Sequence, residues 1–389
     1  MGITLHLTRI FTPSGVASDT IVAADDGTIK YVGPMETAPP VDGPRLDMRG
    51  RLVVPGFIDI HTHGGHGVTF GKMETLEDDL RDYSAWVAST GVTGFLCTVA
   101  APDAESLRAV VAGYVALFEE ETWPGATPLG LHLEGPFLSR EKKGAFNPKW
   151  LREPMLEEAE AVLDVGGRWI RQMTLAPELP GAEEIAALFR SEGVVVSLGH
   201  TNADYETASA ALRGNFTHVT HTFNAQKGFH HRDPGVFGAI MASDHVTAEL
   251  IADTIHVHPG AMKMLVRCLG TDRVVLITDA MAGAGLADGE YDLVGHKVTV
   301  KDGKATLKDG TIAGSAATMD MCVHNLNNEV GVELSDAVRM ASLNPASVLG
   351  LRGTLGSLQA GKKANLTVID EDVNVSMTMV DGKIVYAEF

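Results

Sequence analysis

In the middle of the chain, histidines and carboxylates directly follow apolar stretches that have the length of a β-strand. His61 and His63 stand two residues apart, so in extended backbone their imidazoles point to the same side. Glu134, His200 and His221 each lie at the end of a further apolar stretch. Imidazole and carboxylate are ligands that zinc and iron(II) accept. If these positions converge in space, they predict a metal centre.

Asp279 closes the last of these apolar stretches. A divalent ion can lower the pKa of a water molecule to about 7 and polarise a carbonyl. A carboxylate beside that water can take its proton and pass it to a leaving nitrogen. The residues together predict hydrolysis of an amide-like or amidine-like bond, with Asp279 as general base and then general acid.

Eight apolar segments alternate with segments of helical period. The apolar segments span residues 56–60, 94–99, 129–133, 173–176, 194–198, 217–222, 248–252 and 274–277. Helical period runs through residues 76–89, 105–119, 182–192, 205–212 and 259–268. This alternation predicts an α/β protein with a TIM-like (β/α)8 barrel, whose reactive residues lie at the carboxyl ends of the strands. An open doubly wound sheet has the same alternation, but its dinucleotide-binding form is disfavoured because no Gly-x-Gly-x-x-Gly follows the first strand.

Both ends of the chain are β-rich. Asp25–Asp26–Gly27 and Asp381–Gly382 are hairpin signals between short apolar runs. Neither end is long enough to bury a core alone, so we expect one small β-sandwich built from residues 1–54 and 353–389. The catalytic barrel is then expected over residues 55–352. Within it, residues 291–312 read as an inserted hairpin, followed by helices over 317–328 and 335–349.

The composition of the 389-residue chain narrows the class of protein. With 45% hydrophobic and 21% charged residues it is neither disordered nor fibrous. Its 31 basic and 50 acidic residues give a net charge of −19, which repels nucleic acid and anionic membranes. Three cysteines are too few for a disulfide framework and indicate a reducing compartment. We find no pattern of a signal peptide and no apolar stretch long enough for a bilayer, so we expect a cytoplasmic protein.

The segments around these residues resemble the amidohydrolase superfamily. Pro55 to Gly65, with the sequence PGFIDIHTHGG, carries the superfamily signature, which says little about the substrate. Other segments resemble the N-acetylglucosamine-6-phosphate deacetylase family within it. These are HLEGPF at 132–137, KKGA at 142–145, LGHT at 198–201, THTFNA at 220–225, IAD at 251–253, TDA at 278–280 and AGSA at 313–316.

The resemblance implies a reaction and a metal site. N-acetylglucosamine 6-phosphate would be hydrolysed to glucosamine 6-phosphate and acetate, in amino-sugar catabolism and cell-wall recycling. Glu134, His200 and His221 match the metal ligands of the family, and Asp279 matches its catalytic acid/base. His61 and His63 match a second metal position that only some members have. One or two divalent ions, zinc or iron, are therefore expected, with Glu134 able to bridge them.

The resemblance also implies a substrate pocket and an assembly. Residues that match its substrate-binding positions are Ala145, Asn224, Ala225, Arg232, His256, Ile312 and Ala313. In the family the arginine comes from the neighbouring subunit, which implies a homodimer in which Arg232 reaches the other active site. Phe146 and Gln226 depart from the family pattern at what we expect to be the edge of the pocket, and they leave the fine sugar and acyl specificity open.

A phosphorylated substrate must bind against the net charge of −19. Charges more than about 8 Å apart are largely screened at physiological salt, so a local basic cluster can prevail. Arg232 and His256 are expected to supply it, because arginine suits bidentate phosphate contacts. Lys142 and Lys143 either add to the cluster or form a solvated loop. The roles of His66, expected to be solvated, and of His132, a partner of a ligand or a core residue, stay open too.

Two alternative functions remain. The first is another amidohydrolase acting on a different amide or amidine. Many binuclear members of that superfamily bridge their metals with a carboxylated lysine after the fourth strand, and residues 173–178 contain no lysine. A mononuclear deaminase usually carries His-x-x-Glu where His200 is followed by Thr-Asn-Ala. The second alternative is a noncatalytic barrel scaffold, which would be expected to lose ligands that this chain keeps.

Overall fold

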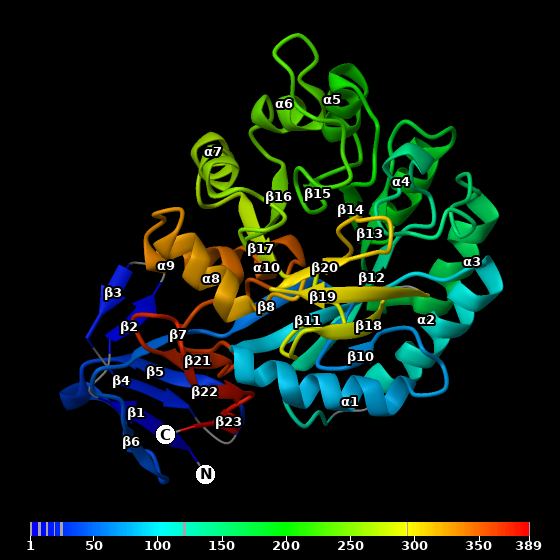
Figure 1. The fold of residues 1–389 in the computed structure, drawn as a ribbon. Helices are drawn as coiled ribbons and strands as arrows, with labels where there is room; N and C mark the ends of the chain where they lie inside the picture. The colour runs from blue at the N-terminus through cyan, green and yellow to red at the C-terminus, as the bar shows by residue number, and fades with distance from the viewer. Residues whose placement is uncertain are drawn as a thin grey trace.

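The computed structural model describes residues 2–6, 9–12, 15–18, 20–23, 26–119, 122–293 and 295–388. The eight predicted strands form one parallel sheet in which every strand pairs with its neighbour in sequence. They are β8 (Phe57–Thr62), β11 (Val92–Val99), β12 (Thr127–Glu134), β13 (Ile170–Leu175), β14 (Val195–Leu198), β15 (His218–Val219), β16 (Thr247–Ile251) and β17 (Val274–Ile277). The sheet curves into a nearly closed TIM-like barrel surrounded by helices, which confirms the predicted fold class (Figure 1).

Hydrogen bonds join the first and last strands of the barrel. The backbone N–H of Asp279, just after β17, donates to the carbonyl of His61 on β8 at 2.9 Å. One oxygen of the buried Asp59 carboxylate accepts from the Thr278 hydroxyl at 2.5 Å, and the other accepts from the Thr278 N–H at 3.4 Å. These contacts close the barrel beside the residues that carry the predicted chemistry.

Side chains of β8 alternate between two environments. Ile58 and Ile60 pack in a buried cluster with Leu349, which directly follows helix α10 (Leu343–Val348). Asp59 and His61 have the opposite parity, so they point to the inside of the barrel. The strand therefore anchors the barrel wall with one set of residues and presents polar groups with the other.

Five of the predicted helices are present with small shifts of their ends. They are α1 (Leu76–Val87), α2 (Ala104–Phe118), α4 (Ala182–Ser191), α5 (Tyr205–Arg213) and α7 (Pro259–Leu269). The side chains of Asp103 and Asp204 cap α2 and α5 by accepting from the N–H groups of Ser106 and Thr207. Two further helices, α3 (Leu156–Gly166) and α6 (Gly235–Met241), were not predicted.

The helices after the eighth strand differ partly from the prediction. The first predicted helix is α8 (Met319–Asn328), close to the expected bounds. The second, predicted as one helix over 335–349, is two helices, α9 (Leu334–Ala341) and α10. They separate at Ser342, where φ is −134° and ψ is −72°, outside the helical region. The apolar period continues across the break, which is why the sequence suggested a single helix.

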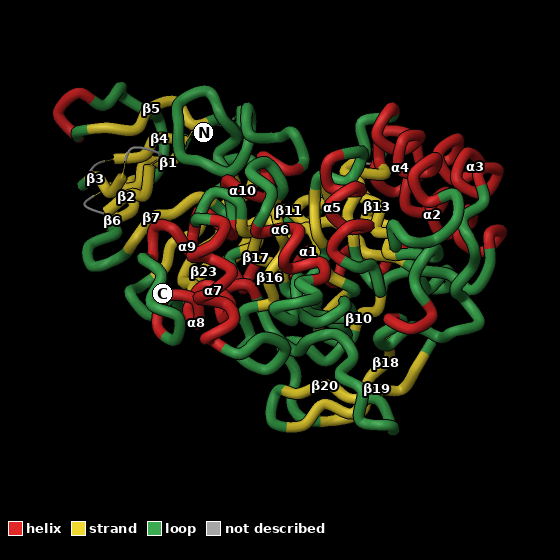
Figure 2. Tube along the Cα trace, turned by 90° about the horizontal axis from the view of Figure 1, so that it is seen from above, coloured by secondary structure: helices red, strands yellow, loops and turns green. Residues whose placement is uncertain are grey.

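Strands from both ends of the chain form two sheets at one side of the barrel (Figures 1 and 2). The sheets have the orders β5-β4-β1-β6 and β23-β22-β21-β7-β2-β3. Their strands are β1 (Ile3–His6), β2 (Arg9–Thr12), β3 (Gly15–Ala17), β4 (Thr20–Ala23), β5 (Ile29–Gly33), β6 (Arg45–Asp47), β7 (Leu52–Pro55), β21 (Leu366–Ile369), β22 (Val375–Val380) and β23 (Lys383–Ala387). Both predicted hairpins are present as antiparallel pairs, although Asp25 of the first turn lies outside the described residues.

The two terminal sheets share one apolar core. Leu5 and Ile29 come from the first sheet, whereas Ile10, Val368 and Met377 come from the second, and all five are buried in one cluster. Strand β7 pairs with β2 on one side and with β21 on the other, so the N-terminal and C-terminal segments are hydrogen-bonded to each other. This arrangement confirms a β-sandwich built from both termini.

The inserted segment after the barrel is larger than predicted. It contains three antiparallel strands, β18 (Gly289–Leu293), β19 (His296–Lys301) and β20 (Lys304–Thr306). The last two are the predicted hairpin around Asp302–Gly303, and β18 is the additional strand. Figure 2 shows this insertion standing out from the body of the barrel.

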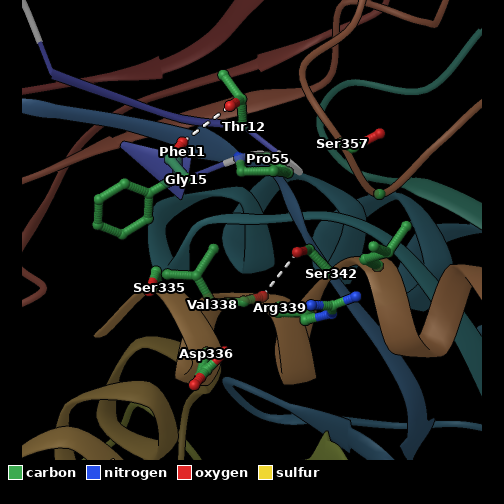
Figure 3. Close-up of a pocket in the computed structure, with 12 residues that line it drawn as sticks. Phe11, Thr12, Gly15, Pro55, Ser335, Asp336, Val338, Arg339, Ser342 and Ser357 are labelled. Carbon is green, nitrogen blue, oxygen red and sulfur yellow. Dashed lines mark hydrogen bonds between the residues drawn. The ribbon is translucent and has the colours of Figure 1, made fainter. Parts of the chain in front are cut away.

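A cavity of about 140 Å³ lies between the terminal sheets and helix α9. Figure 3 shows Phe11 and Pro55 on one side of it and Val338 and Arg339 on the other. Pro55 ends β7 and lies two residues before the start of β8, so the cavity adjoins the amino end of that strand, away from the predicted site. In the part of the chain that the structure describes, no helix combines the length and apolar character needed to cross a bilayer.

Candidate metal centre and active site

The backbone turns sharply where three predicted site residues leave their strands. The φ angle is 46° at His200, 27° at His221 and 49° at Asp279. Residues other than glycine rarely adopt this left-handed region, and each instance costs on the order of 1–3 kcal/mol. Such strain persists only where surrounding structure enforces it, and here it accompanies three side chains that meet at one end of the barrel.

Glu134, His200 and His221 form the first group of potential metal ligands. The Nε2 atoms of His200 and His221 lie 3.1 and 3.2 Å from the same oxygen, Oε1 of Glu134, and 3.0 Å from each other. All three side chains are buried. Two imidazole nitrogens and a carboxylate oxygen that face one point suit a shared cation.

His61, His63 and Asp279 form the second group. Nε2 of His63 lies 3.0 Å from Oε2 of Glu134 and 3.3 Å from Oδ1 of Asp279. Nε2 of His61 lies 3.5 Å from both Glu134 and Asp279 and has no hydrogen-bond partner, although it is fully buried. An unpartnered buried nitrogen aimed at two carboxylates fits a metal ligand, and this donor set suits zinc or iron.

Charge coupling keeps the carboxylates of the site ionised. Burial raises the pKa of Glu134 and of Asp279, but the facing histidines, His61 foremost, outweigh it and hold both pKa values below their ordinary range. Burial likewise lowers the pKa of His63, whereas Asp279 and Glu134 raise it to about 9. Asp279 is therefore an acceptor for a proton at neutral pH.

A pocket of about 340 Å³ opens beside these two groups. Besides His63, Glu134, His200, His221 and Asp279, it is lined by five predicted substrate-binding residues, Ala145, Asn224, Ala225, His256 and Ile312. Leu293, Thr311 and Gly314 complete one wall from the inserted segment and its return, and they were not predicted. A Cβ on Gly314, where φ is 61°, would lie 3.3 Å from the carbonyl oxygen of Asp279, so glycine there allows the wall to approach Asp279.

Two predicted substrate-binding residues do not line this pocket. Ala313 is fully buried, in a small apolar cluster with Met281. Arg232 is exposed, and its guanidinium lies 2.8 Å from the ring of His231. The neighbouring Asp233 pairs with Lys227 at 2.7 Å. Within one chain, Arg232 therefore does not reach the site.

His256 is held by Asp253 at the edge of the pocket. The Asp253 carboxylate accepts from Nδ1 of His256 at 2.6 Å and from the backbone N–H of the same residue at 2.8 Å. Burial lowers the pKa of His256, but Asp253 outweighs it and raises the pKa above the ordinary value. The ring is thus favoured as a cation, which suits an anionic ligand.

The two departures from the family pattern have different positions. Phe146 lines the pocket and packs its edge against the ring of His200, with centroids 5.1 Å apart and planes at 88°. Gln226 is buried behind the pocket, where its amide donates to the Thr220 carbonyl at 2.9 Å. Phe146 thus contacts the potential metal ligand His200 and also lines the pocket, whereas Gln226 braces the loop after β15.

Four residues whose roles the sequence did not decide, His66, His132, Lys142 and Lys143, lie outside the two groups of potential metal ligands. Both ring nitrogens of His132 are occupied by the hydroxyls of Thr98 and Thr174, at 3.1 and 2.8 Å. Its ring packs against that of His61 with centroids 4.5 Å apart. The exposed His66 stacks on Trp86. The backbone carbonyl of Lys142 accepts from Nδ1 of His200 at 2.8 Å, and Lys143 bonds the carbonyl of Gly144.

Sequence reasoning passed over Glu249, a fully buried residue of β16. Its carboxylate contacts His61, His218, His221 and Gln172 directly beneath the site. The available signal was a single acid inside an otherwise apolar strand, because an unpaired buried charge is costly.

The model of the amidohydrolase family matches residues 52–385 of this chain. The chain belongs to this family. It is 36% identical over 95% of its length to an N-acetylglucosamine-6-phosphate deacetylase of Vibrio furnissii, covering 91% of that protein. It is also 35% identical to an N-acetylgalactosamine-6-phosphate deacetylase of Escherichia coli O157:H7, with 98% of each chain covered.

The chain is also similar over its whole length to a solved structure. The crystal structure of N-acetylglucosamine-6-phosphate deacetylase from Pasteurella multocida superposes with a TM-score of 0.93 at 32% identity, covering 100% of both chains. The amidohydrolase barrel and the terminal β-sandwich are therefore shared features of the two proteins.

Proposed function

We propose that this amidohydrolase is a metal-dependent N-acetylglucosamine-6-phosphate deacetylase that acts in amino-sugar catabolism and cell-wall recycling. It hydrolyses the acetamide of N-acetylglucosamine 6-phosphate to glucosamine 6-phosphate and acetate. The observation that carries the proposal is the position of Asp279, whose carboxylate faces both histidines of the second ligand group and also lines the pocket. The names of the full-length relatives support the substrate class.

The two ligand groups would hold the metal. We assign Glu134, His200 and His221 to one ion and His61 with His63 to a second, with Glu134 between them. The ion, zinc or iron, would activate a water molecule and polarise the acetyl carbonyl. The retention of this whole set argues against a noncatalytic scaffold.

The side chains of the pocket then move protons and hold the sugar. Asp279, ionised at neutral pH, would accept the proton of the attacking water and deliver it to the amide nitrogen, so that the amine leaves neutral. Asn224, Ala225 and His256 would bind the phosphorylated sugar, with Ala145 and Ile312 along the acetyl and sugar region. Ala313 is buried and does not line the pocket, so it is not assigned a contact with the substrate. Asp279 is buried beside His61 and His63, so the proton would travel only a short distance between the water, Asp279 and the amide nitrogen.

We further propose that the active protein is a homodimer in which Arg232 completes the neighbouring pocket. The exposed position of Arg232 outside its own pocket supports this arrangement. We place the domain boundaries at residues 1–54 and 353–389 for the β-sandwich and 55–352 for the barrel. Three cysteines without disulfide bonds suit a reducing compartment, and we propose the cytoplasm.

N-acetylgalactosamine 6-phosphate is an alternative substrate, because one full-length relative is named as the deacetylase of that epimer. Acetate release should be measured with N-acetylglucosamine 6-phosphate, N-acetylgalactosamine 6-phosphate and unphosphorylated N-acetylglucosamine. We expect the highest kcat/KM with the first and a large loss without the phosphate. A higher kcat/KM with the galactosamine epimer would move the assignment to that sugar, and no acetate from either phosphorylated sugar would refute it.

A further inference from the structure

Glu249 is a buried charged group that the proposed catalytic steps do not use. It lies within β16, and its side chain is fully buried. Four hydrogen-bond donors converge on it, two on each oxygen. Burial of a carboxylate without partners would be costly, so this set of donors is what allows the charge to remain.

The first contact of Glu249 fixes one metal ligand. Its Oε2 lies 2.9 Å from Nδ1 of His61. A carboxylate accepts hydrogen bonds, so this contact places a proton on Nδ1; in the neutral ring, the form that would bind a metal, the lone pair is then on Nε2. That Nε2 atom is the buried, unpartnered nitrogen that faces Glu134 and Asp279.

The second contact of the same oxygen reaches the other ligand group. The backbone N–H of His221 donates to Oε2 of Glu249 at 3.0 Å. This amide belongs to the residue with φ of 27°, a conformation that needs support from its surroundings. One carboxylate oxygen thus joins a ligand of each proposed metal position.

The other oxygen of Glu249 anchors the carboxylate in the barrel. Oε1 accepts from the amide of Gln172 at 2.7 Å and lies 3.2 Å from Nε2 of His218. Neither residue belongs to the two ligand groups. They hold the carboxylate plane so that Oε2 stays directed at His61.

We propose that Glu249 is a positioning residue that orients His61 and thereby gives this chain its second metal ion. Outer carboxylates that orient a histidine commonly change metal affinity by about 10–100-fold when they are replaced. The inference rests on the proposed metal site, but it does not depend on which sugar the enzyme deacetylates.

The test is a metal titration of the full chain without substrate. Protein freed of metal by a chelator is titrated with Zn²⁺ by calorimetry, and bound zinc is counted after desalting. The wild type should bind two ions per chain. Glu249→Gln should retain the tighter event and weaken the other by about 10–100-fold.

His218→Gln is the matched control. Its amide N–H can replace the imidazole N–H that faces Oε1 of Glu249, and the contact between Oε2 and His61 is left intact. It should bind both ions like the wild type. Two unchanged binding events in Glu249→Gln, or equal weakening in both variants, would overturn the inference. Only one ion in the wild type would overturn it too, whereas no ion at all in the wild type would refute the proposed metal-dependent function itself.

A second variant covers the case in which Glu249→Gln does not fold. Glu249→Asp keeps the buried charge but withdraws the carboxylate from His61 by one methylene. We expect it to weaken the second ion selectively, and a wild-type affinity for both ions in this variant would contradict the positioning role.

Discussion

At the scale of single residues, Glu134 and Asp279 occupy different positions in the site, which suit the different roles that we propose for them. Glu134 presents one oxygen to His200 and His221 and the other to His63, so it lies between the two ligand groups. Asp279 contacts His61 and His63 of the second group, to which it belongs, and it borders the pocket. In the proposed function Glu134 would hold metal, whereas Asp279, at the pocket wall, would exchange a proton with the substrate.

Replacement of Asp279 by asparagine should abolish most turnover. The amide has nearly the same shape but does not accept the proton, and general acid–base groups contribute about 10²–10⁴-fold to rate. Zinc content and thermal unfolding should stay near those of the wild type. Asp288→Asn, at an exposed position before β18, serves as the control. If Asp279→Asn keeps more than about a tenth of kcat, a loss below 1.4 kcal/mol, the assigned role is wrong.

The charge of His256 should make substrate binding depend on pH. Asp253 raises the pKa of His256, aided by Asp279 and opposed by burial and Lys304, so the ring is a cation below that raised value and neutral above it. KM for the phosphorylated sugar should therefore increase as the pH rises through the raised pKa.

Measuring KM between about pH 6 and pH 9 tests this expectation for the wild type and for His256→Gln. The variant should have a higher KM at the acidic end and should lose the increase, and unphosphorylated N-acetylglucosamine is the reference ligand. A KM that is flat, or that falls over this range in the wild type, would be inconsistent with a cationic His256 at the phosphate.

At the scale of elements, the contact between β8 and β17 positions both halves of the site. Asp59 bonds Thr278 and the backbone N–H of His61, one residue from Asp279 and two from His63. Burial raises the pKa of Asp59 to about 7, against the opposing hydrogen bonds of Thr278 and His61. The same polar contact therefore closes the barrel and aligns the residues that follow each strand.

Asp59→Ala should destabilise the barrel and disturb the site together. The variant leaves the Thr278 hydroxyl and backbone amides without their acceptor, at a cost of about 1–3 kcal/mol for each unsatisfied group. The midpoint of thermal unfolding should fall, and the content of bound metal with it. Asp47→Ala, in the terminal β6, should leave both nearly unchanged. An Asp59→Ala protein with wild-type Tm would show that this contact does not hold the barrel together.

The sequence predicted the elements whose signal is local. Eight apolar strands, six helices and the sandwich of the two termini follow from period and turn residues. The break at Ser342 and the strand β18, which pairs with the adjacent β19, were missed. Within the site, strand-end residues were accessible to sequence reasoning, whereas Glu249 acts from inside a strand and only its neighbours in space reveal it.

At the scale of the whole molecule, the net charge of −19 makes the pocket depend on local cations. His256 is present in the pocket, but Arg232 is exposed elsewhere on the same chain. A site completed by a second copy would add an arginine where phosphate must bind, and arginine makes bidentate phosphate contacts. Assembly would then be a condition for activity rather than only for stability.

Mixing two inactive variants tests this assembly. Arg232→Ala and Asp279→Asn should each be poorly active alone on the phosphorylated sugar. After subunit exchange, about a quarter of wild-type activity should return, because half of the dimers are mixed and each holds one complete site. Arg232→Ala should also lose far more kcat/KM with the phosphorylated sugar than with the unphosphorylated one. No recovery in exchanged mixtures of verified dimers would contradict a shared site.

We propose that this chain deacetylates N-acetylglucosamine 6-phosphate with the help of a metal that its two ligand groups would hold. The most direct measurement is the rate of acetate release by chelator-treated protein as zinc or iron is added back, with bound metal counted per chain. We predict no turnover without metal and a rate that rises as the Glu134, His200 and His221 position fills. Undiminished acetate release from protein that holds no metal would contradict the account.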